Sequence, residues 1–200
     1  MYKVYGDKLS GNCYKVKLVL HLLGLPYQWQ DIDILKGETQ TAEFLAMNPN
    51  GKVPVLQLED GTCLWESNAI LNFLADGSDL LPSEPRLRTQ VLQWQFFEQY
   101  SHEPYVAVAR FIQFYLDMPE ERRAEHASCL KRGYKALDVM EQQLARTPYL
   151  VGDNYSIADI TLYAYTHVAE QGGFDLSGYP AINAWMQRVA AHPRHVGMLD

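Results

Sequence analysis

The chain has 200 residues, of which 24 are acidic and 17 are basic, so its formal net charge is −7. Hydrophobic residues make up 48% of it, enough for a chain of this length to bury a core without disulfides or a structural metal. Its basic residues are scattered, which argues against nucleic-acid binding, and no apolar run is long enough for a membrane helix.

The three cysteines, Cys13, Cys63 and Cys129, are widely spaced and form no CxxC pair. No HExxH segment or Cys/His group with zinc spacing occurs, so we expect no metal site. The N-terminal residues contain no apolar block of the kind found in secretory signals. We therefore expect a cytoplasmic protein with reduced thiols.

The first eighty residues alternate between strand and helix signals. The strand signals cover residues 2–5, 27–34, 53–58 and 62–65, and the helical signals cover 13–23, 41–47 and 67–74. Strong turn residues separate several of these segments, among them Asn48-Pro49-Asn50-Gly51 and Asp60-Gly61. The predicted order is therefore β-α-β-α-β-β-α, with Ser67 as the N-cap of the last helix.

From residue 76 to 85 the composition shifts to Asp, Gly, Ser and Pro, and beyond this point only helical signals remain. Helices are predicted over 86–116, 120–145 and 180–191, and Ser156-Ile157-Ala158-Asp159 resembles a capping box at the start of another. We predict an α/β domain of residues 1–76, a linker of residues 77–85 and an all-α domain of residues 86–200.

Ser10-Gly11-Asn12-Cys13 lies between the first strand and the first helix. A helix N-terminus presents free N–H groups and partial positive charge, which favour an anion such as a thiolate, and a hydroxyl there can donate to it. The alternative is that Ser10 and Asn12 only cap the helix.

Two further segments suit an extended ligand with an amino-acid end. A cis bond at Val53-Pro54 would leave the Val53 backbone able to pair with a peptide-like molecule, whereas the ordinary alternative is a trans proline at a strand start. Ser67 and nearby N–H groups can hold a carboxylate while Glu66 holds an ammonium. The alternative at Glu66-Ser67 is a capped helix.

Four segments, SGNCYKV, NPNGKVPVL, WESNAI and YSIADI, occur in this order. Together they resemble the soluble glutathione transferases over essentially the full chain, and the Ser/Asn loop is similar to bacterial theta-, delta- or nu-like members. The resemblance implies an N-terminal thioredoxin-like domain with a mixed four-stranded sheet, followed by a helical bundle. It also implies a homodimer that takes glutathione as co-substrate and no metal.

By position, the resemblance assigns the Val53 backbone, with Pro54 cis, to the cysteinyl part of glutathione. Glu66 and Ser67 match the pair that holds the γ-glutamyl end. Gln40 falls where relatives place a polar or basic side chain near the glycine carboxylate, and Lys52 could assist it.

The resemblance makes Ser10 and Asn12 the catalytic candidates, since Ser10 matches the activating serine of theta- and delta-like classes. Tyr5 is a weaker candidate that is better explained as a packed strand aromatic. Cys13 takes the resolving position of a thioredoxin-type motif, and we expect it to be a small buried hydrophobe.

Three functions follow from these residues. The leading one is attack of a glutathione thiolate on an electrophilic, apolar small molecule. The alternatives are a disulfide or peroxide reductase that uses bound glutathione, and a non-catalytic binding protein that keeps the fold. In the helical domain, Arg110 and Arg132 could meet an anionic group, or could belong to solvated faces or ordinary ion pairs. The resemblance implies that Gln99 or His102 lies near the partner's glutathione.

Overall fold

A computed structural model describes residues 1–200, which divide into two compact units. The first unit comprises Met1–Ser78 together with Pro193–Asp200, and the second comprises Asp79–His192. The chain therefore changes unit between Ser78 and Asp79, inside the predicted linker. Pro193–Asp200, which the sequence analysis placed in the helical domain, belongs to the first unit instead.

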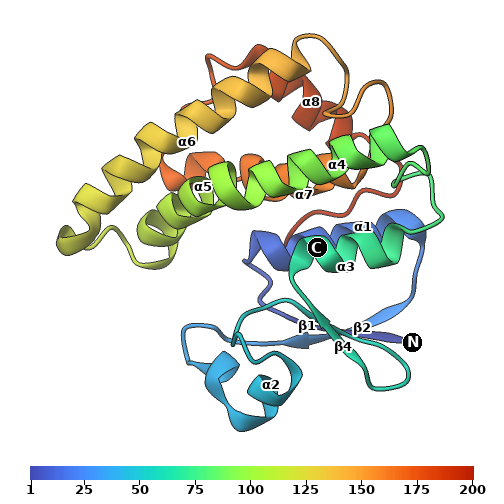
Figure 1. Cartoon of the computed structure of the whole chain (residues 1–200). Coiled ribbons are helices and arrows are strands. Elements are labelled where there is room, and N and C mark those ends of the chain that lie inside the picture. Colours follow the sequence, from blue (N-terminus) through green and yellow to red (C-terminus); the bar gives the residue numbers. More distant parts are fainter. The chain divides into compact units, whose positions relative to one another are not determined.

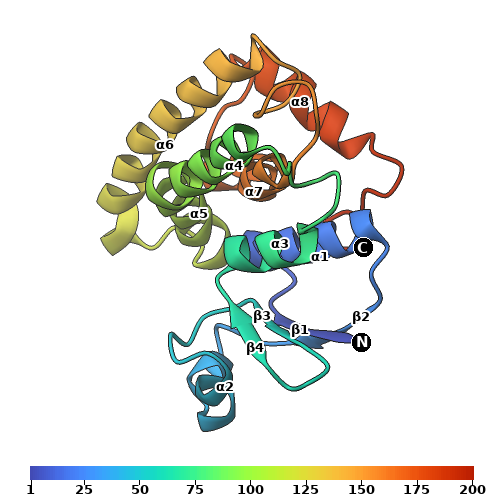
Figure 2. The same cartoon turned by 45° about the vertical axis from the view of Figure 1, so that its right-hand side comes forward.

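The first unit contains a four-stranded sheet in the order β2-β1-β3-β4. β1 runs parallel to β2 and antiparallel to β3, and β3 runs antiparallel to β4, so the sheet is mixed as expected. Helices α1 and α3 lie side by side on one face, and α2 lies on the other side (Figures 1 and 2). The elements are β1 (Tyr2–Gly6), α1 (Gly11–Leu23), β2 (Tyr27–Asp31), α2 (Ala42–Met47), β3 (Val55–Gln57), β4 (Cys63–Trp65) and α3 (Ser67–Ala75).

Local sequence sets both ends of α1. The Ser10 hydroxyl accepts a hydrogen bond from the Cys13 amide at 3.4 Å, which satisfies one of the N–H groups left open at the start of a helix. The helix ends at Gly24, whose φ of 67° is the left-handed conformation that glycine adopts without a side-chain clash. Between them, Val16, Val19 and Leu20 are fully buried and anchor the helix in the core of this unit.

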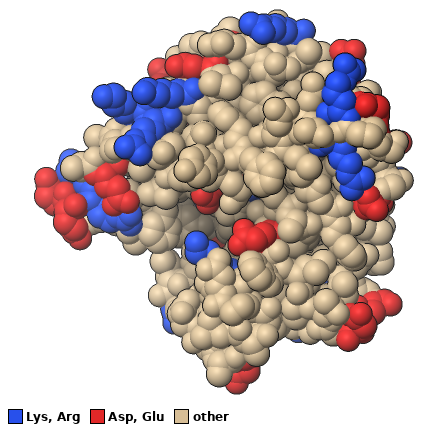
Figure 3. Space-filling view, viewed as in Figure 1, with Lys and Arg blue, Asp and Glu red and all other residues tan.

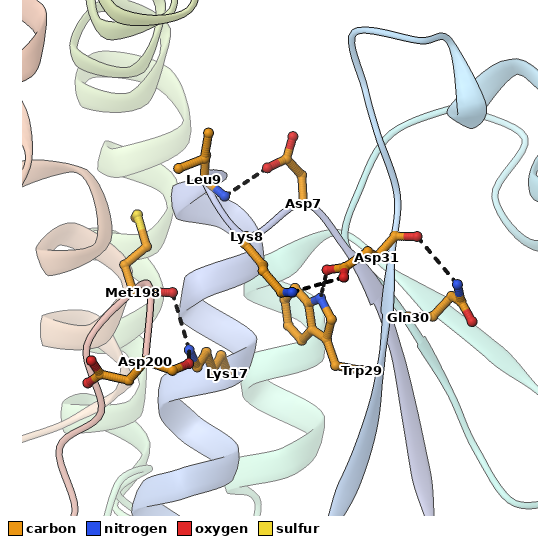
Figure 4. Close-up of polar contacts among 9 residues, drawn as sticks. All are labelled: Asp7, Lys8, Leu9, Lys17, Trp29, Gln30, Asp31, Met198 and Asp200. Carbon is orange, nitrogen blue, oxygen red and sulfur yellow. Dashed lines mark hydrogen bonds and ion pairs between the residues drawn. The ribbon is translucent and has the colours of Figure 1, made fainter.

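The C-terminal segment is held against α1 by backbone oxygens (Figure 4). The Tyr14 hydroxyl donates to the Val196 carbonyl at 2.8 Å. The Lys17 amine donates to the backbone oxygens of Gly197, Met198 and Asp200 at 3.2, 3.2 and 2.6 Å. Because every residue carries the same backbone carbonyl acceptor, no residue pattern marks this attachment in the sequence.

The second unit is helical, as predicted. Where a helix over 86–116 was predicted, a continuous helical stretch covers residues 85–115. Two π-helical segments, Glu98–His102 and Phe111–Tyr115, interrupt its α-helical geometry. The remaining helices pack around it, with α7 against α4 and α6 against α5 (Figure 1). The α-helices are α4 (Pro85–Phe97), α5 (Glu103–Arg110), α6 (Arg123–Leu144), α7 (Ile157–Thr166) and α8 (Pro180–Ala190).

Asp159 organises the core of the second unit from a fully buried position at the start of α7. Its carboxylate accepts from the amides of Leu150 and Ser156 at 3.0 and 2.9 Å, and from the Trp185 indole at 2.9 Å. The capping box predicted at Ser156 and Asp159 is present. Burial raises the pKa of the Asp159 carboxyl to about 6, although these hydrogen bonds act in the opposite direction.

The surface carries mixed charge. On the face shown in Figure 3, basic side chains occur in small groups among uncharged surface, and acidic side chains lie near several of them. None of the helices has the length and apolar character needed to cross a membrane.

Candidate functional site

The strand register brings the three predicted segments to one end of the sheet. Tyr5 of β1 pairs with Val55 of β3, and Val55 pairs with Trp65 of β4. Because β3 runs antiparallel to both neighbours, its beginning lies beside the ends of β1 and β4. The loop to Ser10, the Val53-Pro54 segment and the Glu66-Ser67 segment therefore all leave the sheet at this end.

Ser10 is half-buried at the N-terminus of α1. Its hydroxyl oxygen accepts from the Cys13 amide, so the predicted capping role is real. Accepting this bond leaves the hydroxyl's own proton available for donation, because a serine hydroxyl is both donor and acceptor. Capping and activation of an anion are therefore compatible at Ser10.

Asn12 and Ser67, predicted from separate motifs, are in direct contact. The Ser67 hydroxyl donates to Asn12 Oδ1 at 3.1 Å. A residue that the sequence analysis missed joins them: Lys15 Nζ donates to Asn12 Oδ1 at 2.8 Å and lies 3.4 Å from Ser67 Oγ. The sequence signal that points to this contact is the spacing of Asn12 and Lys15, since residues three apart share one face of a helix.

The Val53-Pro54 bond is cis, as the resemblance implied. Val53 is half-buried and precedes the ladder, which begins at Val55. The turn before it is closed by Asn48, whose side chain donates to the Lys52 carbonyl at 2.7 Å and accepts from the Asn50 amide at 3.0 Å.

The side chains of Gln40 and Lys52 are exposed. The Gln40 amide donates to Thr39 Oγ1 at 3.2 Å and to the Gly51 carbonyl at 3.3 Å. Gly51 has a φ of +62°, and a Cβ at this position would lie 2.6 Å from Gln40 Nε2. The close approach of Gln40 to the turn thus depends on a glycine at position 51.

The start of α3 differs from the prediction. Ser67 was expected to be the N-cap, but it is the first helical residue, and Glu66 occupies the N-cap position without a side-chain cap. Glu66 has φ 67° and ψ 110°, a conformation that costs an L residue about 1–3 kcal/mol and is concentrated at functional sites. The Ser67 hydroxyl is consequently directed to Asn12 instead of to the helix backbone.

Residues 9–76 match the family pattern described as the glutathione S-transferase N-terminal domain, and residues 96–193 match its C-terminal domain. A crystal structure of a glutathione S-transferase from Pseudomonas fluorescens Pf-5 is 79% identical, covers 100% of this chain and 99% of its own, and superposes with a TM-score of 0.99. The disulfide-bond oxidoreductase YfcG of Escherichia coli is 30% identical over 91% of this chain and 87% of its own length.

The chain belongs to the glutathione S-transferase family. It is therefore an enzyme of this family, and its thioredoxin-like unit and helical unit are those of the family fold. A further member, the glutathione transferase URE2P6 of Phanerochaete chrysosporium, is 27% identical over 96% of this chain and 92% of its own, with a TM-score of 0.87, and its structure was determined with oxidised glutathione.

Cys13 and Tyr5 contribute to packing in this glutathione S-transferase. Cys13 is fully buried, and burial raises the pKa of its thiol to about 12. Only about 1 molecule in 10⁵ would carry the thiolate near pH 7, so Cys13 is a poor nucleophile. The Tyr5 hydroxyl donates to Gln57 Oε1 at 3.2 Å, in keeping with a packed strand aromatic.

A separate cavity of about 230 Å³ lies beside β2 and the C-terminal segment, and none of the predicted glutathione residues lines it. Lys8, Trp29 and Asp31 are among its lining residues. Asp31 pairs with the other two, because it accepts from Lys8 Nζ at 2.9 Å and from the Trp29 indole at 2.8 Å (Figure 4).

No group of three or more His, Cys, Asp or Glu side chains is arranged to hold a metal ion.

Proposed function

We propose that this glutathione S-transferase binds glutathione at the end of the sheet described above and activates its thiol as a thiolate. In this proposal Ser10 donates a hydrogen bond to the sulfur, Asn12 supports the same position, and the N-terminus of α1 adds favourable partial charge. The thiolate then forms a sulfur–carbon bond to an electrophile, and the leaving group departs with its electron pair.

The remaining parts of glutathione would be held by the segments that leave the same end of the sheet. Glu66 and Ser67 would hold the ammonium and carboxylate of the γ-glutamyl end, and the Val53 backbone would pair with the cysteinyl unit. Gln40, with Lys52, would lie near the glycine carboxylate. The observation that carries the proposal is the 3.1 Å hydrogen bond from Ser67 to Asn12, which joins in one cluster the residues proposed for the γ-glutamyl end and for the thiol.

The acceptor molecule is proposed to be small and apolar. The two arginines that could have met an anionic acceptor already have protein partners: Arg110 Nε donates to Gln171 at 2.7 Å, and Arg132 donates to the Tyr105 hydroxyl at 3.3 Å. The Arg110 guanidinium also lies 4.9 Å from the centre of the Phe114 ring. We therefore assign neither arginine to the binding of an anionic acceptor.

A second candidate is reduction of disulfides or peroxides by bound glutathione. It is favoured by the Ser10/Asn12 loop together with a relative named as a disulfide-bond oxidoreductase and another studied with oxidised glutathione. The high pKa of the Cys13 thiol fits this route equally well, because glutathione and not the protein would supply the reacting sulfur. Two glutathione molecules, or one oxidised molecule, would then occupy the site.

One experiment separates these functions. Glutathione binding is measured by calorimetry, and turnover is compared for a chloronitrobenzene and for bis(2-hydroxyethyl) disulfide. Conjugation that exceeds disulfide reduction supports the transferase, and the reverse order supports the reductase. Absence of glutathione binding would contradict both and leave the non-catalytic binding protein.

We further propose a cytoplasmic homodimer. Leu92, Phe96 and Tyr100 recur every four residues along one helical face and are 36%, 70% and 85% exposed, which is typical of a surface that another chain covers. Gln99 is exposed and can reach a partner chain, whereas His102 is buried and hydrogen-bonded to Thr166, so the proposed partner contact involves Gln99 alone. Sedimentation of the wild type and Phe96→Ser tests the dimer.

The three cysteines are unpaired with one another, in keeping with the reducing compartment of a cytoplasmic protein.

A further inference from the structure

Lys15 lies in the second turn of α1 and is fully buried. Lysine side chains usually extend their amines to water, and an amine kept from water requires hydrogen-bond partners to offset the lost hydration. Among the residues it contacts are Asn12 and Ser67, which the proposed function assigns to the glutathione site. The position of Lys15 therefore calls for a role connected with that site.

The contacts around Lys15 fix the orientation of the Asn12 side chain. Asn12 Oδ1 accepts from Lys15 Nζ at 2.8 Å and from Ser67 Oγ at 3.1 Å. Rotating the amide by half a turn would place its NH2 group, which is a donor only, against the donating amine of Lys15. The carbonyl end is therefore held toward Lys15, and the NH2 end is the end of Asn12 that can donate to a ligand.

We propose that Lys15 is a positioning residue that holds Asn12 with its NH2 group as the donor to the glutathione thiolate and orients Ser67 for the γ-glutamyl carboxylate. This inference rests on the proposed function. A lysine charge beneath the site also favours the anionic form of both ligand groups, because charges away from bulk water are weakly screened. Lys15 itself does not contact the reacting sulfur.

The competing explanation is that Lys15 only ties α1 to α3 and so stabilises the fold. The two explanations differ in what they predict for the thiol. A tie between helices affects unfolding, whereas a positioning residue sets the pKa of bound glutathione and hence the pH at which the rate rises.

The test compares Lys15→Met with Lys17→Met, a matched variant that removes another buried lysine from the same helix. Lys17 donates to backbone oxygens of the C-terminal segment and has no contact with Asn12 or Ser67 among its hydrogen bonds. The pKa of bound glutathione is measured from thiolate absorbance, alongside kcat and KM against pH. We expect Lys15→Met to raise this pKa by about one unit, to lower kcat about tenfold at neutral pH and to recover it at high pH. Lys17→Met should reduce stability and leave the pKa unchanged.

If the pKa of bound glutathione is depressed in the wild type and is the same in folded Lys15→Met, the inference is overturned but the proposed function is left intact. Absence of any depression in the wild type instead overturns the proposed function. If Lys15→Met does not fold, Asn12→Asp replaces it, because the carboxylate still accepts from Lys15 but cannot donate to a thiolate. Loss of the depression in Asn12→Asp supports the orientation argument, and its retention refutes it.

Discussion

Replacing Asp159 by alanine tests how far one buried carboxylate holds the helical unit together. The substitution leaves three buried N–H donors without their acceptor, namely the amides of Leu150 and Ser156 and the indole of Trp185. Each unsatisfied buried donor costs about 1–3 kcal/mol, so the loss is about 6 kcal/mol at the middle of the range.

Part of this loss is offset because the variant no longer buries a charge. The pKa of the Asp159 carboxyl is raised from 3.8 to about 6, which corresponds to about 3 kcal/mol of unfavourable ionisation above that pH. The expected net decrease in the free energy of unfolding of Asp159→Ala is therefore about 3 kcal/mol near pH 7.5. For a chain of this size, it corresponds to a fall in Tm of about 6–12 °C.

The assay is urea unfolding at fixed protein concentration, followed by circular dichroism, with Asp153→Ala as the control. Asp153 is an exposed aspartate near the same capping segment, so its replacement should change the free energy of unfolding by about 0.5 kcal/mol at most. Equal stabilities for the two variants would refute the argument from hydrogen bonds to Asp159.

Three other predictions follow from the structure. The folded-state pKa of Asp159 lies above its unfolded value, so its contribution to stability is present below about pH 4 and is lost as the pH rises through about 6. The stability advantage of wild type over Asp159→Asn in urea should therefore shrink by about 2.4 kcal/mol between pH 4 and pH 7.5, and a constant difference would contradict this prediction. Cys13→Ala should keep kcat/KM within about threefold of wild type, since the thiol pKa of about 12 leaves almost no thiolate, and a loss of activity in the folded variant would indicate a catalytic thiol. Gly51→Ala should weaken glutathione binding in calorimetry more than Gly37→Ala, because both glycines have positive φ but only a Cβ at Gly51 meets Gln40; equal affinities would remove Gln40 from the site.

Local residue chemistry predicted several element boundaries in both units. The cap at Ser10, the end of α1 at Leu23 and the capping box at Ser156 each depend on neighbours within a few residues, so the sequence carries the whole signal. The turn before Val53 is local in the same way, because Asn48 within the turn closes it.

Features that depend on residues far apart in the chain could not be predicted in this way. The contact of Ser67 with Asn12 requires α1 and α3 to lie together, and this tertiary contact replaced the predicted cap. The burial of Lys15 has no local signal, because its sequence neighbours are those of an ordinary helical lysine. The C-terminal segment joins the first unit through backbone oxygens, which every residue possesses.

Two π-helical segments within the predicted 86–116 helix were also missed. They change the hydrogen-bond step from i→i+4 to i→i+5 without any proline or glycine at their starts, Glu98 and Phe111. Apolar spacing over a long window still indicates a helix, so the prediction located the element but not its local geometry.

The central claim is that the N-terminal loop of α1 stabilises the glutathione thiolate, and the most direct test is the pKa of bound glutathione in wild type and Ser10→Ala. The account predicts that the wild-type pKa lies about two units below that of free glutathione, which corresponds to about 2.7 kcal/mol, and that Ser10→Ala moves it back toward the free value. A depression that survives the substitution would transfer the role to Asn12 or the helix N-terminus. Glutathione that binds to the wild type with the thiol pKa of the free molecule would contradict the account.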